Sequence, residues 1–125
     1  MTVLVLDIGS SSVRALLFDD QARPIPDALV ARPYQIMTEP PGAATLDAET
    51  LRDHVESAID QILQHPAAAT IRVVGMDTLV GNVVGVDAHN HALTPIYPYA
   101  DTRCAVEPTR VSKSSRFVQF STPAS

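Results

Sequence analysis

The sequence of 125 residues contains few of the features that mark several common classes of protein. Cys104 is the only cysteine, so no internal disulfide can form, which fits a reducing compartment such as the cytoplasm. No apolar run approaches the roughly 18 residues that a membrane-spanning helix requires. The first residues also lack the basic segment and apolar stretch of a secretory signal. We therefore expect a cytoplasmic protein without a membrane partner.

Basic residues are scarce as well. The chain has 9 Lys and Arg residues against 14 Asp and Glu residues, and its net charge is −5. A general binder of nucleic acid or membrane surfaces would carry a basic face, so this balance argues against both partners. The hydrophobic fraction of 46% is enough for a buried core. The length corresponds to one domain or to part of a larger one.

The clearest chemical pattern is the stretch VLVLDIGSSSVRALLFDD at residues 3–20. An apolar run ends at Asp7, a turn of Gly9 and three serines follows, and Arg14 opens a second apolar run. Such a turn can aim N–H groups and hydroxyls at an anion, a carboxylate can hold Mg²⁺, and arginine can pair with phosphate oxygens. The alternative is an ordinary β-hairpin whose serines only satisfy turn geometry. The spacing alone leaves both hypotheses open.

The apolar pattern predicts strands separated by one long helix. Strands are expected at residues 2–8, 13–18, 28–37, 71–76 and 80–86. The run at 2–8 is almost wholly apolar, the pattern of a strand covered on both faces, and the strand at 71–76 is expected to be buried as well. Pro33 removes a ladder donor, so the third strand should lie at an edge or carry a bulge. Three antiparallel strands, a helix and a parallel return suggest a mixed α/β sheet, the beginning of a ribonuclease-H-like layout.

The helix is expected to begin after Asp47, a candidate N-cap, and to end at His65-Pro66. Between these limits apolar residues from Leu51 to Ile62 recur at the 3.6-residue spacing of one helix face. Residues 87–92 are expected to form a turn. Asn90 would supply its left-handed residue in place of glycine.

Three stretches, in this order, resemble the FGGY carbohydrate kinases of the actin, Hsp70 and sugar-kinase superfamily. The first is similar to the family's first phosphate motif, and the second to the strand pair that lines the sugar site. The third is similar to a stretch ending in D-x-R, with Tyr99 where tryptophan is usual. The stretches are LDIGSSSVRALLFD, IRVVGMDTLVGNVVGVD and LTPIYPYADTRC, and the likeness covers residues 2–105. The string YADTR resembles gluconokinase-like or xylulokinase-like members.

The resemblance implies ATP-dependent phosphorylation of a sugar or sugar acid, with Mg²⁺ and ATP as cofactors. Phosphoryl transfer needs positioned phosphates, a metal and a base rather than covalent chemistry from the protein. By match to the family, Asp7 would hold the metal. The residues expected to bind the ATP phosphates are Gly9, Ser10, Ser11, Ser12 and Arg14. Those expected near the substrate are Asp77, Thr78, Gly81, Asn82, Asp101 and Arg103.

Some of these residues have simpler alternatives. Asp101 and Arg103 are expected to form a local ion pair that fixes their loop rather than to act directly in catalysis. Val80-Gly81 stand about where many members have a methionine-histidine pair, which leaves the sugar open. His89 and His91 have the spacing of a metal pair, but histidines in turns are usually solvated. Cys104 is expected to be an inert small hydrophobic residue.

The resemblance also implies that the chain holds only part of a kinase. Members have about two ribonuclease-H-like domains, with the adenine site largely in the second and the catalytic aspartate downstream of this segment. We therefore expect residues 1–107 to form the N-terminal part of the first domain and to be inactive alone. Residues 108–125 are expected to be an atypical, disordered tail. This tail has no acidic residue and contains the only lysine, so we hypothesise a changed reading frame or an artificial end, against a natural terminus.

A second hypothesis is a non-catalytic module, similar to actin-like and Hsp70-like proteins, that uses the phosphate turn for assembly or nucleotide sensing. The string YADTR argues against it because it resembles the sugar kinases. Under either hypothesis an incomplete sheet would leave apolar surface and a strand edge open. Such an edge invites self-association of the chain.

Overall fold

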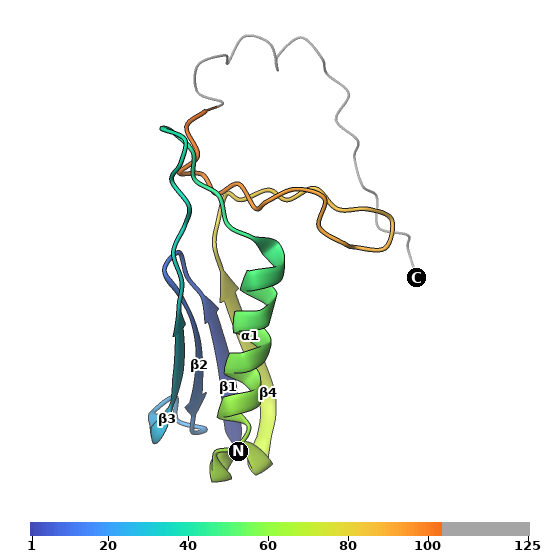
Figure 1. Ribbon diagram of the computed structural model, residues 1–125. Helices are drawn as coiled ribbons and strands as arrows, with labels where there is room; N and C mark the ends of the chain where they lie inside the picture. Colours follow the sequence, from blue (N-terminus) through green and yellow to red (C-terminus); the bar gives the residue numbers. More distant parts are fainter. Residues whose placement is uncertain (104–125) are drawn as a thin grey trace.

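The computed structural model describes residues 1–103, in which a four-stranded sheet carries one α-helix on one face (Figure 1). The strands lie in the order β3-β2-β1-β4; β1 pairs with β2 and β2 with β3 antiparallel, whereas β1 and β4 are parallel. The predicted mixed sheet is therefore confirmed. The elements are β1 (Thr2–Ile8), β2 (Ser12–Phe18), β3 (Pro24–Pro33), α1 (Ala48–Ile62), the 3₁₀ helix η1 (Pro66–Thr70) and β4 (Ile71–Thr78).

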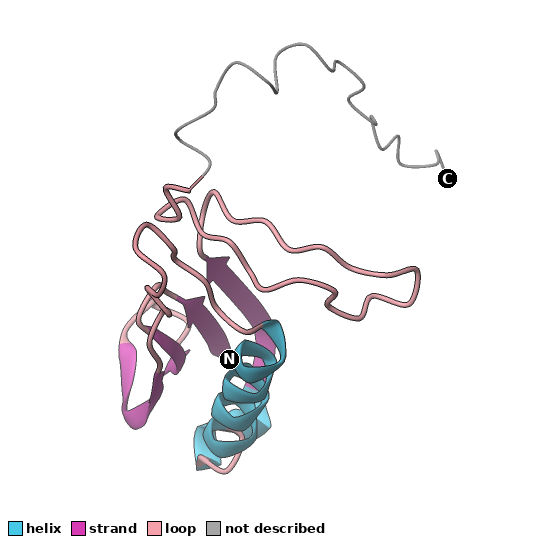
Figure 2. Cartoon of the chain, turned by 45° about the horizontal axis from the view of Figure 1, so that its top comes forward, coloured by secondary structure: helices cyan, strands magenta, loops and turns pink. Residues whose placement is uncertain are grey.

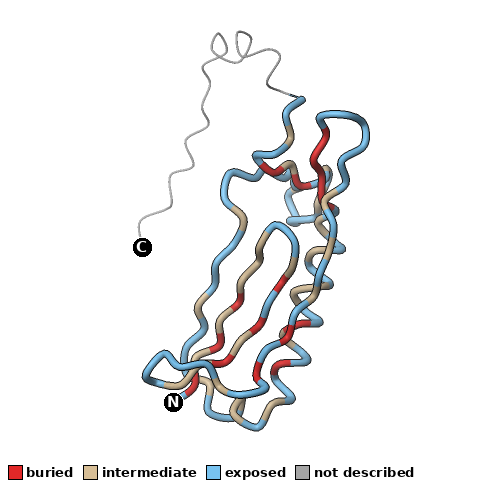
Figure 3. The backbone as a smooth tube through the Cα atoms, turned by 90° about the vertical axis from the view of Figure 1, so that its left-hand side faces the viewer, coloured by how far each residue is buried: buried red, intermediate tan, exposed pale blue. Residues whose placement is uncertain are grey.

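The core lies between α1 and the sheet, because side chains alternate between the two faces of each strand. In β1, Leu4 and Leu6 are buried in the core, while Val3 and Val5 point to the opposite face and are only half-buried. Many buried positions fall on the strands and on one side of α1, and others lie in the segment 43–46 and at Ile96 (Figure 3). The buried core residues are Leu4, Leu6, Val13, Ala15, Leu17, Ala28, Val30, Ala58 and Ile62.

Helix α1 begins and ends close to the predicted residues. The carboxylate of Asp47 accepts a hydrogen bond from the Thr50 N–H at 2.7 Å, which satisfies one of the free donors of the first turn. Ala58 and Ile62 are the buried part of its apolar stripe. Pro66 opens η1, because proline at the first helical position loses no hydrogen bond.

Strand β3 lies at the sheet edge, as Pro33 predicts, but it occupies residues 24–33 rather than 28–37. The preceding turn explains the earlier start. Asp19 accepts hydrogen bonds from the N–H groups of Gln21 and Arg23, so the chain reverses early and Pro24 pairs with Phe18. After Pro33 the chain leaves the ladder, and the segment before α1 forms isolated pairs, Met37 with Thr45 and Leu46 with Ile96.

Strand β4 runs from Ile71 to Thr78, but the prediction that it is buried is wrong. The side chains of Val73, Val74 and Met76 are 46%, 59% and 68% exposed. An apolar run of this kind is typical of a strand covered on both faces. Among the described residues, no strand pairs with the outer edge of β4, and α1 packs instead on β2 and β3.

The prediction of a strand at residues 80–86 is also wrong. Residues 80–97, which we call the ribbon, double back with only two isolated pairs, Val83 with Tyr97 and Val86 with Ala92. Prolines in the returning segment lack the N–H that a regular ladder needs. Asn90 turns the ribbon with a φ of 64°, as predicted. Figure 2 shows the ribbon extending away from the sheet and α1.

Within residues 1–103, no helix is long and apolar enough to cross a membrane. Cys104 and the predicted tail at 108–125 lie outside the described residues.

Candidate functional site

A cavity of about 440 Å³ opens where the parallel strands β1 and β4 both end. Asp7 on β1 stands directly opposite Asp77 on β4 in the parallel register, and both residues line this cavity, which we call the phosphate cavity after the role predicted for its residues. The carboxyl ends of parallel strands are where α/β folds commonly bind ligands. The lining is completed by the turn after β1, the residues after β4 and the segment 98–100.

Arg14 is bound to the Asp7 carboxylate in an ion pair across β1 and β2. The Arg14 side chain is 51% exposed and that of Asp7 is 29% exposed, so solvent reaches both partners. A cation at Asp7 would therefore compete with the guanidinium or share the carboxylate with it. The same guanidinium has further donors that remain available to an anion.

The turn between β1 and β2 is held by three hydrogen bonds. The Gly9 N–H donates to the Ser12 carbonyl at 3.0 Å, which closes the turn. The Tyr34 hydroxyl donates to the Gly9 carbonyl, and the Tyr34 N–H donates to the Ser11 carbonyl at 3.0 Å. In the part of the chain that the structure describes, the Ser10 N–H has no hydrogen-bond acceptor. It is therefore a free donor beside the cavity, as an anion-binding turn requires.

A second cavity, of about 630 Å³, shares Pro98 and Tyr99 with the first. Its wall includes Asp101 and Arg103, whose side chains form an ion pair at 2.5 Å. The Arg103 guanidinium also lies over the ring of Tyr97, 5.7 Å from its centre. The predicted local ion pair is confirmed, and the carboxylate it involves is only 9% exposed.

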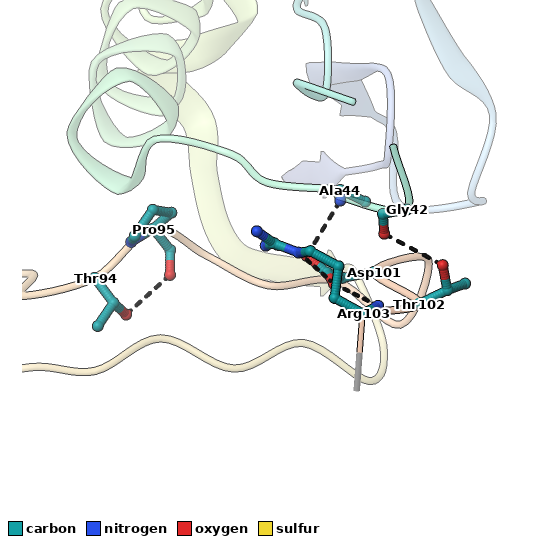
Figure 4. Close-up of polar contacts among 7 residues, drawn as sticks. All are labelled: Gly42, Ala44, Thr94, Pro95, Asp101, Thr102 and Arg103. Carbon is teal, nitrogen blue, oxygen red and sulfur yellow. Dashed lines mark hydrogen bonds and ion pairs between the residues drawn. The ribbon is translucent and has the colours of Figure 1, made fainter. Parts of the chain in front are cut away.

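Asp101 joins two loops that are far apart in the sequence (Figure 4). Its carboxylate accepts a hydrogen bond from the Ala44 N–H at 3.1 Å, and the neighbouring Thr102 N–H donates to the Gly42 carbonyl at 3.0 Å. The hydrogen bonds from the Arg103 side chain, with those from the Ala44 and Arg103 N–H groups, hold the pKa of Asp101 well below its usual range. The same pair raises the pKa of Arg103.

The predicted site residues divide into three groups. Those that line the phosphate cavity are Asp7, Gly9, Ser10, Asp77 and Thr78. Those that line the second cavity are Gly81, Asp101 and Arg103. Those that line neither are Ser11, Ser12, Arg14 and Asn82. Asn82 instead donates a side-chain hydrogen bond to the Leu79 carbonyl at 2.5 Å. The functional roles of all these residues stay predictions.

The site set predicted from sequence omits two tyrosines. Tyr99 lines both cavities and is 81% exposed, and its place in the third stretch was a usable signal. Tyr34 contacts the turn from 25 residues away, and no local motif marks it. Burial raises the pKa of the Tyr34 phenol, and the negative charge of Asp7 is a second, smaller cause of the same shift.

Carboxylate oxygens are the ligands that Mg²⁺ prefers, and Asp7 and Asp77 place two of them at one cavity. Within residues 1–103, no group of three or more His, Cys, Asp or Glu side chains could hold a metal ion. His89 and His91 lie near each other in the ribbon turn, where Asp87 accepts hydrogen bonds from both of their N–H groups. Two carboxylates suit a cation whose other ligands are water and phosphate oxygens.

The sheet order β3-β2-β1-β4 with α1 on one face defines the ribonuclease-H-like, actin-like fold class. The family model described as the FGGY family of carbohydrate kinases, N-terminal domain, matches residues 2–122. The chain belongs to this family, which confirms the resemblance. The match runs past the predicted boundary at residue 107, and that boundary stays a prediction.

Solved kinase structures share the fold. A xyloylose kinase from Brucella ovis superposes with a TM-score of 0.80 and 24% identity, over 90% of this chain and 24% of that one. A xylulose kinase from Rhodospirillum rubrum has a TM-score of 0.79 and 23% identity, over 90% of this chain and 23% of that one. A gluconate kinase from Lactobacillus acidophilus has a TM-score of 0.75 and 20% identity, over 90% of this chain and 22% of that one. The chain thus spans about a quarter of their length. No curated protein sequence matches it.

Proposed function

We propose that this chain supplies the phosphate-binding wall of a kinase that transfers a phosphoryl group from ATP to a hydroxyl of a sugar or sugar acid. The observation that carries the proposal is one cavity bounded by Asp7, Gly9 and Ser10 on one side and by Asp77 and Thr78 on the other. Phosphates and substrate must meet in such a space, because the reaction depends on positioning and charge neutralisation.

On the phosphate side, the Ser10 N–H donates to a phosphate oxygen, and Arg14 adds positive charge from the next strand. Asp7 would hold Mg²⁺, with Asp77 beside it on β4, and the ion would supply neutralisation of charge on the phosphates. Arg14 pairs with the Asp7 carboxylate and has further guanidinium donors for a phosphate oxygen.

On the substrate side, Thr78 and Tyr99 face the phosphate cavity, and the second cavity continues the wall with Gly81, Asp101 and Arg103. The hydroxyl of Thr78 can hydrogen-bond a sugar, and the exposed ring of Tyr99 offers it an apolar face. Asp101 is engaged by Ala44 and Arg103, so its part is to fix the loop that presents Tyr99. Asn82, bound to Leu79, supports the start of the ribbon.

The chain by itself is proposed to be inactive. The resemblance places the catalytic aspartate and most of the adenine site downstream, and the chain spans about a quarter of the kinases it resembles. A coupled assay with ATP and a panel of pentoses, hexoses and sugar acids should give no turnover by the purified chain. Phosphorylation proportional to its concentration would contradict the proposal.

Binding of nucleotide phosphates tests the site without requiring catalysis. In ¹⁵N NMR titrations with Mg-ADP, we expect the amide signals of Gly9, Ser10 and Ser11 to shift while core amides stay in place. Asp7→Asn should weaken the response at least severalfold, because it removes the charged metal ligand. The matched control is Asp60→Asn on the exposed face of α1, which changes the charge equally and should leave the titration unchanged. Equal binding by wild type and Asp7→Asn would contradict the metal role.

A second candidate is the assembly module, and the unpaired outer edge of β4 within the described residues favours it. A second copy of this chain could pair along that edge and cover Val73, Val74 and Met76. Size-exclusion chromatography with and without Mg-ATP separates the candidates. Nucleotide-dependent assembly would favour the module, whereas an elution volume indifferent to nucleotide favours the kinase portion.

A further inference from the structure

Tyr34 stands directly after β3 and contacts the phosphate turn without lining the phosphate cavity. We propose that Tyr34 is a positioning residue of this turn: its hydroxyl holds the Gly9 carbonyl away from the cavity, so that the Ser10 N–H faces a bound phosphate. The inference deepens the proposed function and rests on it, because the phosphate is the ligand that this N–H would bind.

The two hydrogen bonds from Tyr34 fix the turn at two points. The hydroxyl donates to the carbonyl of Gly9, and the backbone N–H donates to the carbonyl of Ser11 at 3.0 Å. Ser10 lies between the two fixed residues. The position of its amide therefore depends on a residue from a different strand rather than on the turn alone.

Peptide geometry carries the argument from the carbonyl to the amide. The Gly9 C=O and the Ser10 N–H belong to one planar trans peptide unit, so they point in opposite directions. Gly9 and Ser10 line the cavity and Tyr34 does not. A carbonyl drawn toward Tyr34 thus turns the Ser10 N–H to the cavity side. Because glycine has unusual backbone freedom, this peptide would otherwise be easy to rotate.

Tyr34 is itself held by the fold. It packs against the buried core, and its ring stacks on His54 of α1 with 6.0 Å between ring centres. A tyrosine phenol is protonated at neutral pH, so the Tyr34 hydroxyl can donate to Gly9. The helix thereby supports the turn through one aromatic pair.

The test compares wild type with Tyr34→Phe, which keeps the ring and removes only the hydroxyl. The ¹³C shift of the Gly9 carbonyl reports the hydrogen bond directly and should change, while the shifts of core carbonyls stay in place. The dissociation constant for Mg-ADP should rise about fivefold, the effect of one ordinary hydrogen bond. The matched control is Tyr97→Phe, because the Tyr97 hydroxyl has no hydrogen-bond partner among the described residues.

A Gly9 carbonyl shift identical in wild type and Tyr34→Phe, with Mg-ADP binding unchanged, overturns the inference and leaves the proposed function standing. A wild-type chain that binds neither Mg-ADP nor tripolyphosphate overturns the proposed phosphate site, and the positioning role with it. If Tyr34→Phe fails to fold, nuclear Overhauser contacts in the wild type test whether Tyr34 lies against Gly9. A contact between the Tyr34 ring and the Gly9 α-protons supports the inference, and its absence overturns it.

Discussion

The strands on the two sides of β1, β2 and β3 on one and β4 on the other, differ in how their apolar side chains are covered. On the side of β2 and β3, Val13, Ala15 and Leu17 are completely buried under α1. On the side of β4, Val73, Val74 and Met76 are between 46% and 68% exposed, and exposed apolar residues of the ribbon include Val80, Val83 and Leu93. The first side is stabilised by its own core. The second exposes an apolar surface that another surface would have to cover.

The candidate site crosses this boundary. Asp7, the phosphate turn and Tyr34 belong to the side with the buried core, whereas Asp77, Thr78 and Tyr99 belong to the exposed side. We therefore expect Asp7 and the turn between β1 and β2 to hold the same positions before and after a ligand binds. The position of Tyr99 is expected to depend on the contacts of Asp101 with Ala44 and Arg103, which fix the loop that carries it.

Leu17→Ala should have the largest effect, because Leu17 is fully buried in the core between β2 and α1. Truncation there should lower the free energy of unfolding by about 2–5 kcal/mol, measured by urea denaturation. Met76→Ala on β4 is the matched comparison and should cost less than about 0.5 kcal/mol. Equal losses at the two positions would remove the distinction between the sides.

Ile62→Val tests the helix contribution to the same core. Ile62 is 2% exposed at the end of α1, and the loss of one methyl group should cost about 0.5–1.5 kcal/mol. Val74→Ala on β4 removes two methyl groups at a 59% exposed position and should cost less. A greater loss at Val74 would show that β4 is covered in solution.

Asp101→Asn should change the response to acid. Because the folded state lowers the pKa of Asp101, the carboxylate stabilises the fold above its unfolded pKa of about 4, and this contribution is lost as pH falls below that value. The variant should show a shallower fall in unfolding midpoint between about pH 5 and pH 2. Some slope should remain from Asp19, Asp47 and Asp87, whose pKa values are also lowered by hydrogen bonds. Asp60→Asn is the control, and an identical slope in both variants would refute a special role for Asp101.

Met76→Gln should have the smallest effect on stability, within about 0.5 kcal/mol, because its side chain is largely exposed. If the β4 surface mediates self-association, the variant should instead shift the chain toward monomer in sedimentation velocity. A monomeric wild type would argue against that surface as an interface between copies.

Local sequence predicted much of the helix and the first strands. The Asp47 cap and the edge position implied by Pro33 depend on nearby residues and are observed, and α1 ends at Ile62, three residues before the predicted stop at His65-Pro66. The start of β3 was wrong because Asp19 reverses the chain through side-chain hydrogen bonds that apolar periodicity does not reveal. Residues 80–86 have strand composition but lack a regular partner, since prolines interrupt the segment opposite.

For the candidate site, sequence motifs identified the phosphate turn, Asp77 and the Asp101–Arg103 pair. They did not show that Gly81, Asp101 and Arg103 border a second cavity, nor that Arg14 engages Asp7. Tyr34 could not be found this way, because its contact with Gly9 depends on how β3 leads past the turn. Side-chain contacts across strands are set by register, which a single sequence does not display.

The sequence by itself determined the family, the order of the helix and the first strands, and the turn between β1 and β2, because each depends on motifs or periodicity over short spans. Only the tertiary structure decided that Asp7 and Asp77 meet at one cavity, that Tyr34 holds the turn, and that β4 is exposed. These features depend on which strands become neighbours. That choice is made by burial of the common core under α1, which no local segment specifies.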